Sequence, residues 1–66
     1  MEIILNGENR EIAESTTAAQ LIETLGLAGK RLAMEVNQEI VPRSAYSTHL
    51  FQAGDRVEIV RAIGGG

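Results

Sequence analysis

The sequence contains no cysteine and only one histidine, His49. The absence of cysteine excludes disulfide bonds, thiolate metal ligands, a catalytic thiol and a persulfide on the chain itself. A zinc site built on paired histidines is also not expected, because a second imidazole is missing. We therefore predict neither a metal site nor a bound cofactor.

Long apolar runs are also absent. A bilayer span needs about 20 apolar residues, and the opening run, Ile3–Leu5, is far shorter. The opening also lacks the basic lead and apolar core of a secretory signal peptide. Six basic side chains stand against nine acidic ones, for a formal net charge of −3. This sign disfavours nucleic acid and anionic membranes as main partners. Because neither a membrane span nor a signal peptide is indicated, we expect a cytoplasmic protein, and we expect it to be monomeric when free.

The chain has the size and composition of one small folded unit. It has 66 residues, of which 44% are hydrophobic and 23% are charged. A chain this short does not divide into two cores, and this balance is typical of globular proteins. We predict one domain over residues 1–63, followed by a flexible glycine tail over 64–66.

The first third predicts a hairpin and then a helix. Asn6-Gly7 suits a type I′ turn between strands at 2–6 and 9–13, because both residues tolerate a positive φ. Thr17 and Gln20 have the spacing of a capping box, and apolar residues recur at helical spacing after them. Gly26 has the character of a helix C-terminal residue. These signals predict a short helix between Thr17 and Gly26.

The remainder predicts three more strands. Residues 32–36 and 39–41 form short apolar runs around a turn at Asn37-Gln38, and Pro42 ends the second run. Residues 43–52 show no clean period, and we expect Tyr46, Leu50 and Phe51 to cover one end of the core. Residues 56–61 alternate at period two, as a final strand does.

This order of elements favours an α+β fold. The elements follow one another as a hairpin, a helix, two short strands, an irregular crossing and a last strand. This order predicts a four- to five-stranded mixed sheet with one helix packed on one face. With the last strand placed centrally beside the first, the arrangement is a β-grasp, or ubiquitin-like, fold.

Three of the seven glycines, Gly64, Gly65 and Gly66, directly follow the last predicted strand. Glycine has no side chain to pack, so the tail adds nothing to the core, and a bare backbone fits a channel that any Cβ would obstruct. The five residues after Arg61 reach roughly 15–18 Å when extended. We therefore expect the reactive group to be the main-chain carboxylate of Gly66, although a frayed or added end would look the same.

The whole chain resembles the thiamine-biosynthesis sulfur carrier proteins. The stretches that carry the resemblance are AMEVNQEIVPR at 33–43, GDRVEIVRAI at 54–63 and the closing glycines. The chain departs from the family pattern at Tyr46, where tryptophan is frequent, and by the additional Gly64. The resemblance implies a protein cosubstrate rather than an enzyme, with a ubiquitin-like fold and a diglycine end.

The resemblance also implies the chemistry at Gly66 and the partners. An ATP-dependent activating enzyme adenylates the carboxylate, and sulfur from a cysteine desulfurase or another donor then displaces AMP. The resulting thiocarboxylate supplies sulfur to thiazole synthase, which builds the thiazole ring of thiamine. The catalytic groups and the ATP site belong to those partners.

Three other functions stay open on the residues alone. One is the small subunit of molybdopterin synthase, which donates sulfur from the same fold. Another is a ubiquitin-like modifier ligated through Gly66, and the last is a β-grasp interaction module whose tail has no role.

Alternation also predicts a surface for partners. If the helix covers Ile3 and Val57, then Ile4 and Val60 lie on the open face of the sheet. We expect these two residues, extended by Phe51 and Met34, to form an apolar patch of the kind that marks partner sites. Arg61, which precedes the tail, is the basic residue best placed to contact an acidic partner group.

Overall fold

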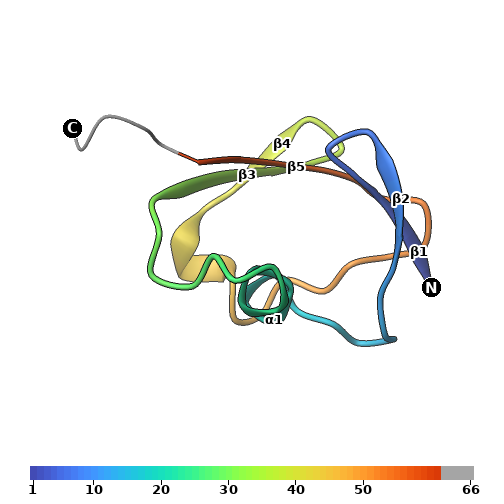
Figure 1. Cartoon of the computed structure of the whole chain (residues 1–66), viewed down its shortest axis with the longest axis horizontal. Helices are drawn as coiled ribbons and strands as arrows, with labels where there is room; N and C mark the ends of the chain where they lie inside the picture. The colour runs from blue at the N-terminus through green and yellow to red at the C-terminus, as the bar shows by residue number, and fades with distance from the viewer. Residues whose placement is uncertain (62–66) are drawn as a thin grey trace.

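The computed structural model describes residues 1–61, so the predicted domain boundary at residue 63 lies outside the described part. A mixed sheet and one helix form two layers (Figure 1). The elements in chain order are β1 (Glu2–Leu5), β2 (Glu8–Glu11), α1 (Ala18–Thr24), β3 (Leu32–Val36), β4 (Glu39–Val41), a 3-10 turn η1 (Arg43–Ala45) and β5 (Arg56–Arg61). The predicted order of elements is confirmed.

The local signals at the hairpin and the helix are confirmed. Asn6 and Gly7 both have positive φ, of 49° and 83°, as a type I′ turn requires. The Thr17 hydroxyl accepts the backbone N–H of Gln20 at 3.1 Å, and the Gln20 side chain accepts the backbone N–H of Thr17 at 2.8 Å. Gly26 has a φ of 74° directly after the C-cap, Leu25. Short-range polar contacts therefore define both ends of α1.

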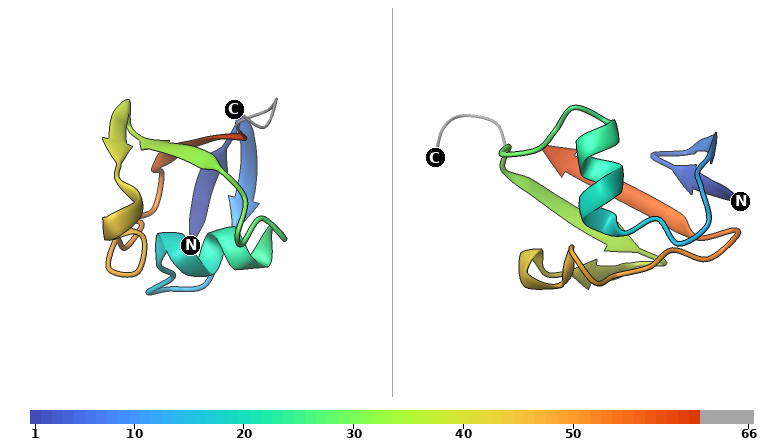
Figure 2. Two further views of the ribbon diagram at one scale, coloured as in Figure 1. Left: turned by 90° about the vertical axis from the view of Figure 1, so that its left-hand side faces the viewer. Right: turned by 90° about the horizontal axis from the view of Figure 1, so that it is seen from below.

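The strand order is β2-β1-β5-β3-β4, with β1 and β5 parallel and the other pairs antiparallel. This is the predicted β-grasp arrangement, with the last strand at the centre of the sheet. α1 lies beneath the sheet and crosses β3 and β5 (Figure 2). The first and last strands of the chain are thus neighbours.

The core lies between α1 and one face of the sheet. Ile3, Leu21, Met34 and Val57 are the largest fully buried side chains. Ile3, Val57 and Ile59 all face the helix layer, as alternation predicts. Tyr46 packs on this core as a partly buried side chain.

The irregular segment before β5 differs from the prediction in two respects. Phe51 is buried in the core, which confirms its expected place there but not its predicted place on the open face, and Leu50 is 55% exposed rather than covering the core. The cause is a backbone connection to the start of α1: the carbonyls of Tyr46 and His49 accept the N–H groups of Ala19 and Ala18, both at 2.9 Å. An isolated β-bridge between Thr17 and Leu50 continues this connection. The segment is therefore fixed against the helix, and Phe51 is directed inward.

Candidate functional site

The predicted reactive residues, Gly64, Gly65 and Gly66, lie outside the described residues. The structure does describe β5, which ends at Arg61 and leads toward them, and the surface around the end of that strand. In Figure 1 β5 crosses the sheet and ends at the side of the molecule away from the N-terminus. The candidate site is therefore the end of β5 with its surroundings.

β5 is held on the β1 side by an asparagine carboxamide. Asn6 lies just beyond the end of β1, and its backbone N–H donates to the Val57 carbonyl at 2.8 Å. Its side chain accepts the Ile59 N–H at 2.9 Å and donates to the Ile59 carbonyl at 3.3 Å. The Asn6 side chain thus makes the hydrogen bonds to β5 that the main chain of β1 would make if that strand continued beyond Leu5.

A second asparagine holds the start of the same strand. Asn37, in the turn between β3 and β4, accepts the Arg56 N–H at 3.0 Å through its side-chain oxygen. Its side-chain nitrogen donates to the Asp55 carboxylate at 3.1 Å, and that carboxylate also accepts the Gln52 N–H at 2.8 Å. Both asparagines have a positive φ, which this residue type tolerates better than most. The register of β5 is fixed near both of its ends.

On the open face of the sheet, the side away from α1, this register places residues of neighbouring strands side by side in rows across the sheet. Ile4 lies opposite Arg56, Glu35 lies opposite both Glu58 and Ile40, and Ala33 lies opposite Val60. Charged residues therefore occupy the middle of the face, between Ile4 and Val60. Ile40 and Val60 are 69% and 64% exposed.

The predicted apolar patch is not continuous. Val60 follows Arg56 by four residues, so Ile4 and Val60 are separated by about 13 Å along the strand, with Glu58 between them. Phe51 and Met34 do not extend the face, because both are buried, with 4% and 0% exposure. That part of the prediction is wrong. Val60 and Arg61 are exposed near the end of β5, whereas Ile4 is half-buried at the other end of the face.

The neighbours of Val60 are residues that sequence reasoning missed. A shallow hollow of about 360 Å³ is lined by Arg31, Leu32, Ala33, Arg43 and Val60. Alternation along β3 identifies Ala33, because it must face away from the buried Met34. Arg31 directly precedes β3, and Arg43 is the first residue of η1. In neither place does the spacing of apolar residues indicate which way a side chain faces. An apolar floor between two guanidinium groups is suited to a partner segment with an apolar and an acidic side chain.

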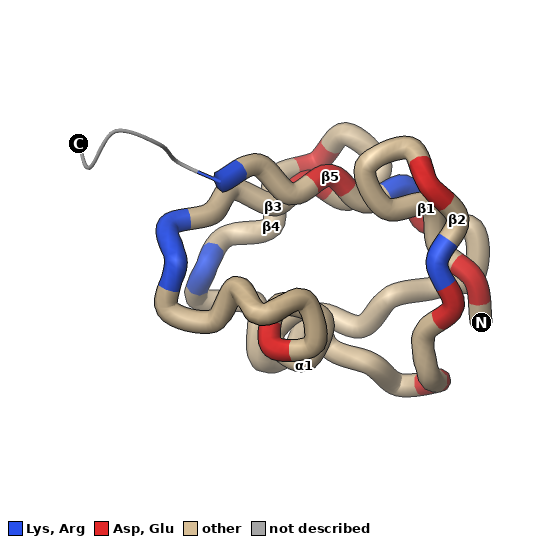
Figure 3. Tube along the Cα trace, in the orientation of Figure 1, with Lys and Arg blue, Asp and Glu red and all other residues tan. Residues whose placement is uncertain are grey.

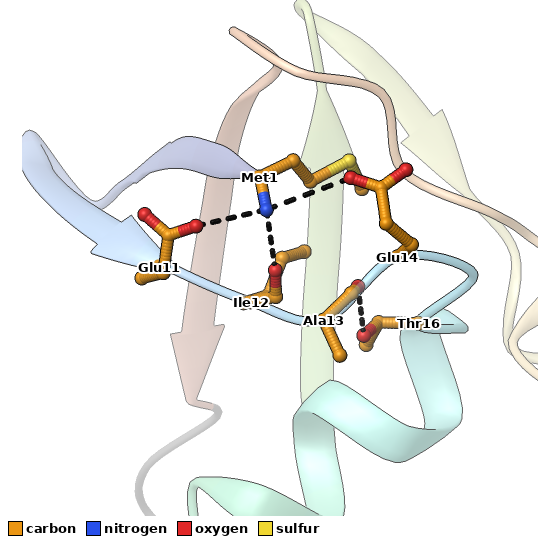
Figure 4. A network of polar contacts seen from close by, with 6 residues as sticks. All are labelled: Met1, Glu11, Ile12, Ala13, Glu14 and Thr16. Atoms are coloured by element: carbon orange, nitrogen blue, oxygen red, sulfur yellow. Dashed lines mark hydrogen bonds and ion pairs between the residues drawn. The ribbon is translucent and has the colours of Figure 1, made fainter.

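The opposite end of the molecule holds an ionic network at the N-terminus (Figure 4). The Met1 ammonium lies 2.9 Å from a Glu11 carboxylate oxygen and 3.7 Å from one of Glu14, and it donates to the Ile12 carbonyl at 2.8 Å. The hydrogen bond to Glu11 raises the pKa of this ammonium above its ordinary value of 8.0, against a smaller lowering by desolvation. This network joins the N-terminus to the end of β2 and to the residues that follow it, and it lies far from the end of β5.

Within residues 1–61, no three histidine or acidic side chains come close enough together to hold a metal ion. In the same part of the chain, no helix has both the length and the apolar character needed to cross a bilayer.

The fold and the end of β5 define the class of protein: a ubiquitin-like β-grasp domain whose central strand leads to a glycine-rich end. The sequence model of the ThiS family matches residues 3–66, and the chain belongs to that family.

Individual relatives agree with this assignment. The chain is 33% identical to the sulfur carrier protein ThiS of Escherichia coli, over all of both chains. It is 42% identical to a stretch of thiazole synthase from Paramagnetospirillum magneticum and 39% identical to a stretch of thiazole synthase from Magnetococcus marinus. The match takes in all of this chain but only 20% of each of those two proteins. The chain therefore spans about a fifth of the length of these relatives.

A solved structure supports the fold in three dimensions. The crystal structure of the thiamine biosynthesis protein ThiS from Geobacter metallireducens superposes with a TM-score of 0.84 at 30% identity, over all of both chains. The solution structure of the Geobacter protein superposes with a TM-score of 0.81, and the match takes in all of this chain and 88% of that one.

Proposed function

We propose that this chain is a sulfur carrier of thiamine biosynthesis and acts as a protein cosubstrate rather than an enzyme. The observation that carries the proposal is the alignment with the E. coli sulfur carrier protein from end to end, in a chain whose sequence closes on Gly64-Gly65-Gly66. The geometry supports it because β5, fixed at both ends by Asn6 and Asn37, leads to that segment.

The proposed reactive group is the carboxylate of Gly66. A carboxylate is a poor electrophile, so its oxygen first attacks the α-phosphate of ATP, which forms an acyl-adenylate and releases pyrophosphate. A sulfur nucleophile then attacks the carbonyl carbon and AMP leaves. When the sulfur arrives as a persulfide, reduction of its S–S bond by a thiol leaves the thiocarboxylate. Glycines at Gly64 and Gly65 let the backbone enter a narrow channel, because they present no Cβ to its walls.

The proposed partners follow from this chemistry. An ATP-dependent activating enzyme supplies the adenylation, and a cysteine desulfurase or another donor supplies the sulfur. Thiazole synthase receives the sulfur, and the two thiazole synthases that contain a stretch similar to this whole chain support that pairing. ATP is then bound by the activating enzyme, and the carrier needs no cofactor of its own. We place this exchange in the cytoplasm.

The docking surface in this proposal is the end of β5, with Val60 as its apolar contact and Arg61 as its nearest basic residue. Val60 lies on the open face beside Ala33, near the segment that must reach the active site. Ile4 stays a candidate for a second contact at the other end of the face, whereas the buried Phe51 is withdrawn.

Intact-mass measurement tests the function. Incubated with the activating enzyme, ATP and a sulfur donor, the protein should gain the mass difference between one sulfur and one oxygen atom. Gly65→Val should slow the gain strongly, because the new side chain must enter the channel, whereas Asn9→Val, on the exposed strand β2, should not. A wild-type protein that never gains this mass would contradict the proposal, and isopeptide adducts at lysines in cells would favour a modifier instead.

A further inference from the structure

Positive charge is concentrated at one end of a molecule that is negative overall. Of the six basic side chains, Lys30, Arg31, Arg43 and Arg61 lie around the end of β5, and only Arg10 and Arg56 lie elsewhere (Figure 3). The acidic residues lie mainly around β1, β2 and the N-terminus and in the middle of the sheet (Figure 3), and α1 contributes Glu23. We call these four residues the basic end.

The basic end is built from three segments that are distant in sequence. Arg43, at the start of η1, donates from Nη2 to the Lys30 carbonyl at 3.2 Å and so joins η1 to the loop before β3. The Leu27 N–H donates to the Ile22 carbonyl at 3.0 Å, which holds that loop against the end of α1, and the Lys30 N–H in turn donates to the Leu27 carbonyl at 3.0 Å. Arg61 lies opposite Leu32 in the β3–β5 register. The four charges are therefore carried on backbone positions that the fold fixes.

The basic end borders the hollow beside Val60. Arg31 and Arg43 line this hollow together with Leu32, Ala33 and Val60. Val60 is 64% exposed, and Ala33 lies opposite it. A binding segment would thus find an apolar floor flanked by groups that pair with carboxylates in bidentate geometry.

We propose that the basic end and the Val60 hollow together dock an acidic segment of the activating enzyme, with a carboxylate between Arg31 and Arg43 and an apolar side chain on Val60. This inference rests on the proposed function and adds the chemistry of the partner surface. Any enzyme that acts on the segment after Arg61 must cover this end of the carrier. Because the rest of the carrier is strongly acidic, an acidic enzyme surface attracts only this end and so orients the carrier as the two proteins meet.

Charge reversal with a matched control tests the docking. Arg31→Glu and Arg43→Glu should each slow association with the activating enzyme by about tenfold, since steering of this kind acts mainly on the association rate. Arg10→Glu makes the same change of charge on β2 and should stay within about twofold of wild type, because it lies outside the steering surface. Wild-type association should also weaken with added salt, whereas the two reversed variants should depend on salt less.

A second pair of variants separates charge from structure at Arg43. Arg43→Lys keeps the charge and should retain most of the association rate, whereas Arg43→Gln removes the charge and should not. Circular dichroism identifies any variant that fails to fold, and Arg31→Glu does not touch the Arg43–Lys30 hydrogen bond. Equal rates for Arg31→Glu and Arg10→Glu would overturn the docking proposal.

The rate at which wild type and the variants gain sulfur distinguishes an error in the docking proposal from an error in the proposed function. If wild type gains sulfur at normal rate and so do both reversed variants, the docking inference is wrong and the sulfur-carrier proposal stands. If wild type gains no sulfur, both proposals fail. If inorganic phosphate or ATP alone shifts the NMR signals of Arg31 and Arg43, and the enzyme rate is insensitive to the reversals, the basic end is a phosphate site.

Discussion

The side-chain carboxamide of Asn6 pairs with both the N–H and the carbonyl of Ile59, across 53 positions of sequence. β1 ends at Leu5, opposite Val57, and without this contact β5 would lose its partner on that side four residues before its own end at Arg61. On the β1 side, the end of this strand is therefore aligned by a side chain, whereas on the other side its ladder with β3 continues to Arg61.

Asn6→Gly should destabilise the protein by about 1–3 kcal/mol, because two hydrogen bonds of a partly buried group are lost while the positive φ is kept. The free energy of unfolding in urea measures this change, and hydrogen exchange of the Ile59 amide should speed up. Asn9→Ala, on the exposed β2, should change stability by less than about 0.5 kcal/mol. Unaltered Ile59 exchange in Asn6→Gly would contradict the role assigned to the carboxamide.

Glu35→Lys should stabilise the protein by about 0.2–1 kcal/mol, because Glu35 and Glu58 lie directly opposite each other in the β3–β5 register and like charges in this geometry repel. Glu39→Lys makes the same change opposite the apolar Val36 and serves as the control. The advantage of Glu35→Lys over the control should shrink with added salt. An advantage that salt leaves unchanged would point to packing instead.

The Met1 ammonium makes stability depend on pH in the alkaline range. Its pKa is raised in the folded protein, chiefly by the hydrogen bond to Glu11, so folding favours the protonated form. This contribution is fully present below pH 8.0, the ordinary value, and is lost as the pH rises through the raised pKa. The melting temperature of wild type should therefore fall more steeply above neutral pH than that of Glu11→Gln. Glu8→Gln should follow wild type, and parallel curves for wild type and Glu11→Gln would be the contrary result.

Val60→Asp should abolish capture of the carrier by the activating enzyme and by thiazole synthase, because it places a carboxylate in the hollow proposed to receive acidic partner groups. Ile40→Asp introduces the same charge at a residue that is at least as exposed on the same face but in another row, and should leave capture largely intact. Both variants should keep the circular dichroism of wild type. Loss of capture in both to the same degree would show that the whole face, rather than the end of β5, is the docking surface.

Sequence alone predicts the parts of this fold that depend on near neighbours. Thr17 and Gln20 are three residues apart, and Asn6-Gly7 is a dipeptide, so the capping box and the first turn are visible as local patterns. Alternation correctly assigns Ile3, Val57 and Ile59 to the core. The order of elements then limits the architecture to a few choices, of which the β-grasp is confirmed.

The errors concern placements that depend on distant residues. Phe51 is directed inward because its segment is bonded to the start of α1, and no period within residues 43–52 reports that contact. Ile4 and Val60 share a face, but only the pairing of Ile4 with Arg56 reveals that they lie at opposite ends of it. The Arg43 bond to the Lys30 carbonyl, which forms the basic end, is equally invisible in either segment by itself.

The central position of β5 also has a consequence for how the protein is made. Ribosomes add about 5–20 residues per second from the N-terminus, so β5 is synthesised after every other strand. Until then β1 and β3 have no common neighbour, and the side of the core formed by Val57 and Ile59 stays open. A nascent chain interrupted before residue 56 therefore has an incomplete hydrophobic core, which makes such fragments ready substrates for cellular proteases.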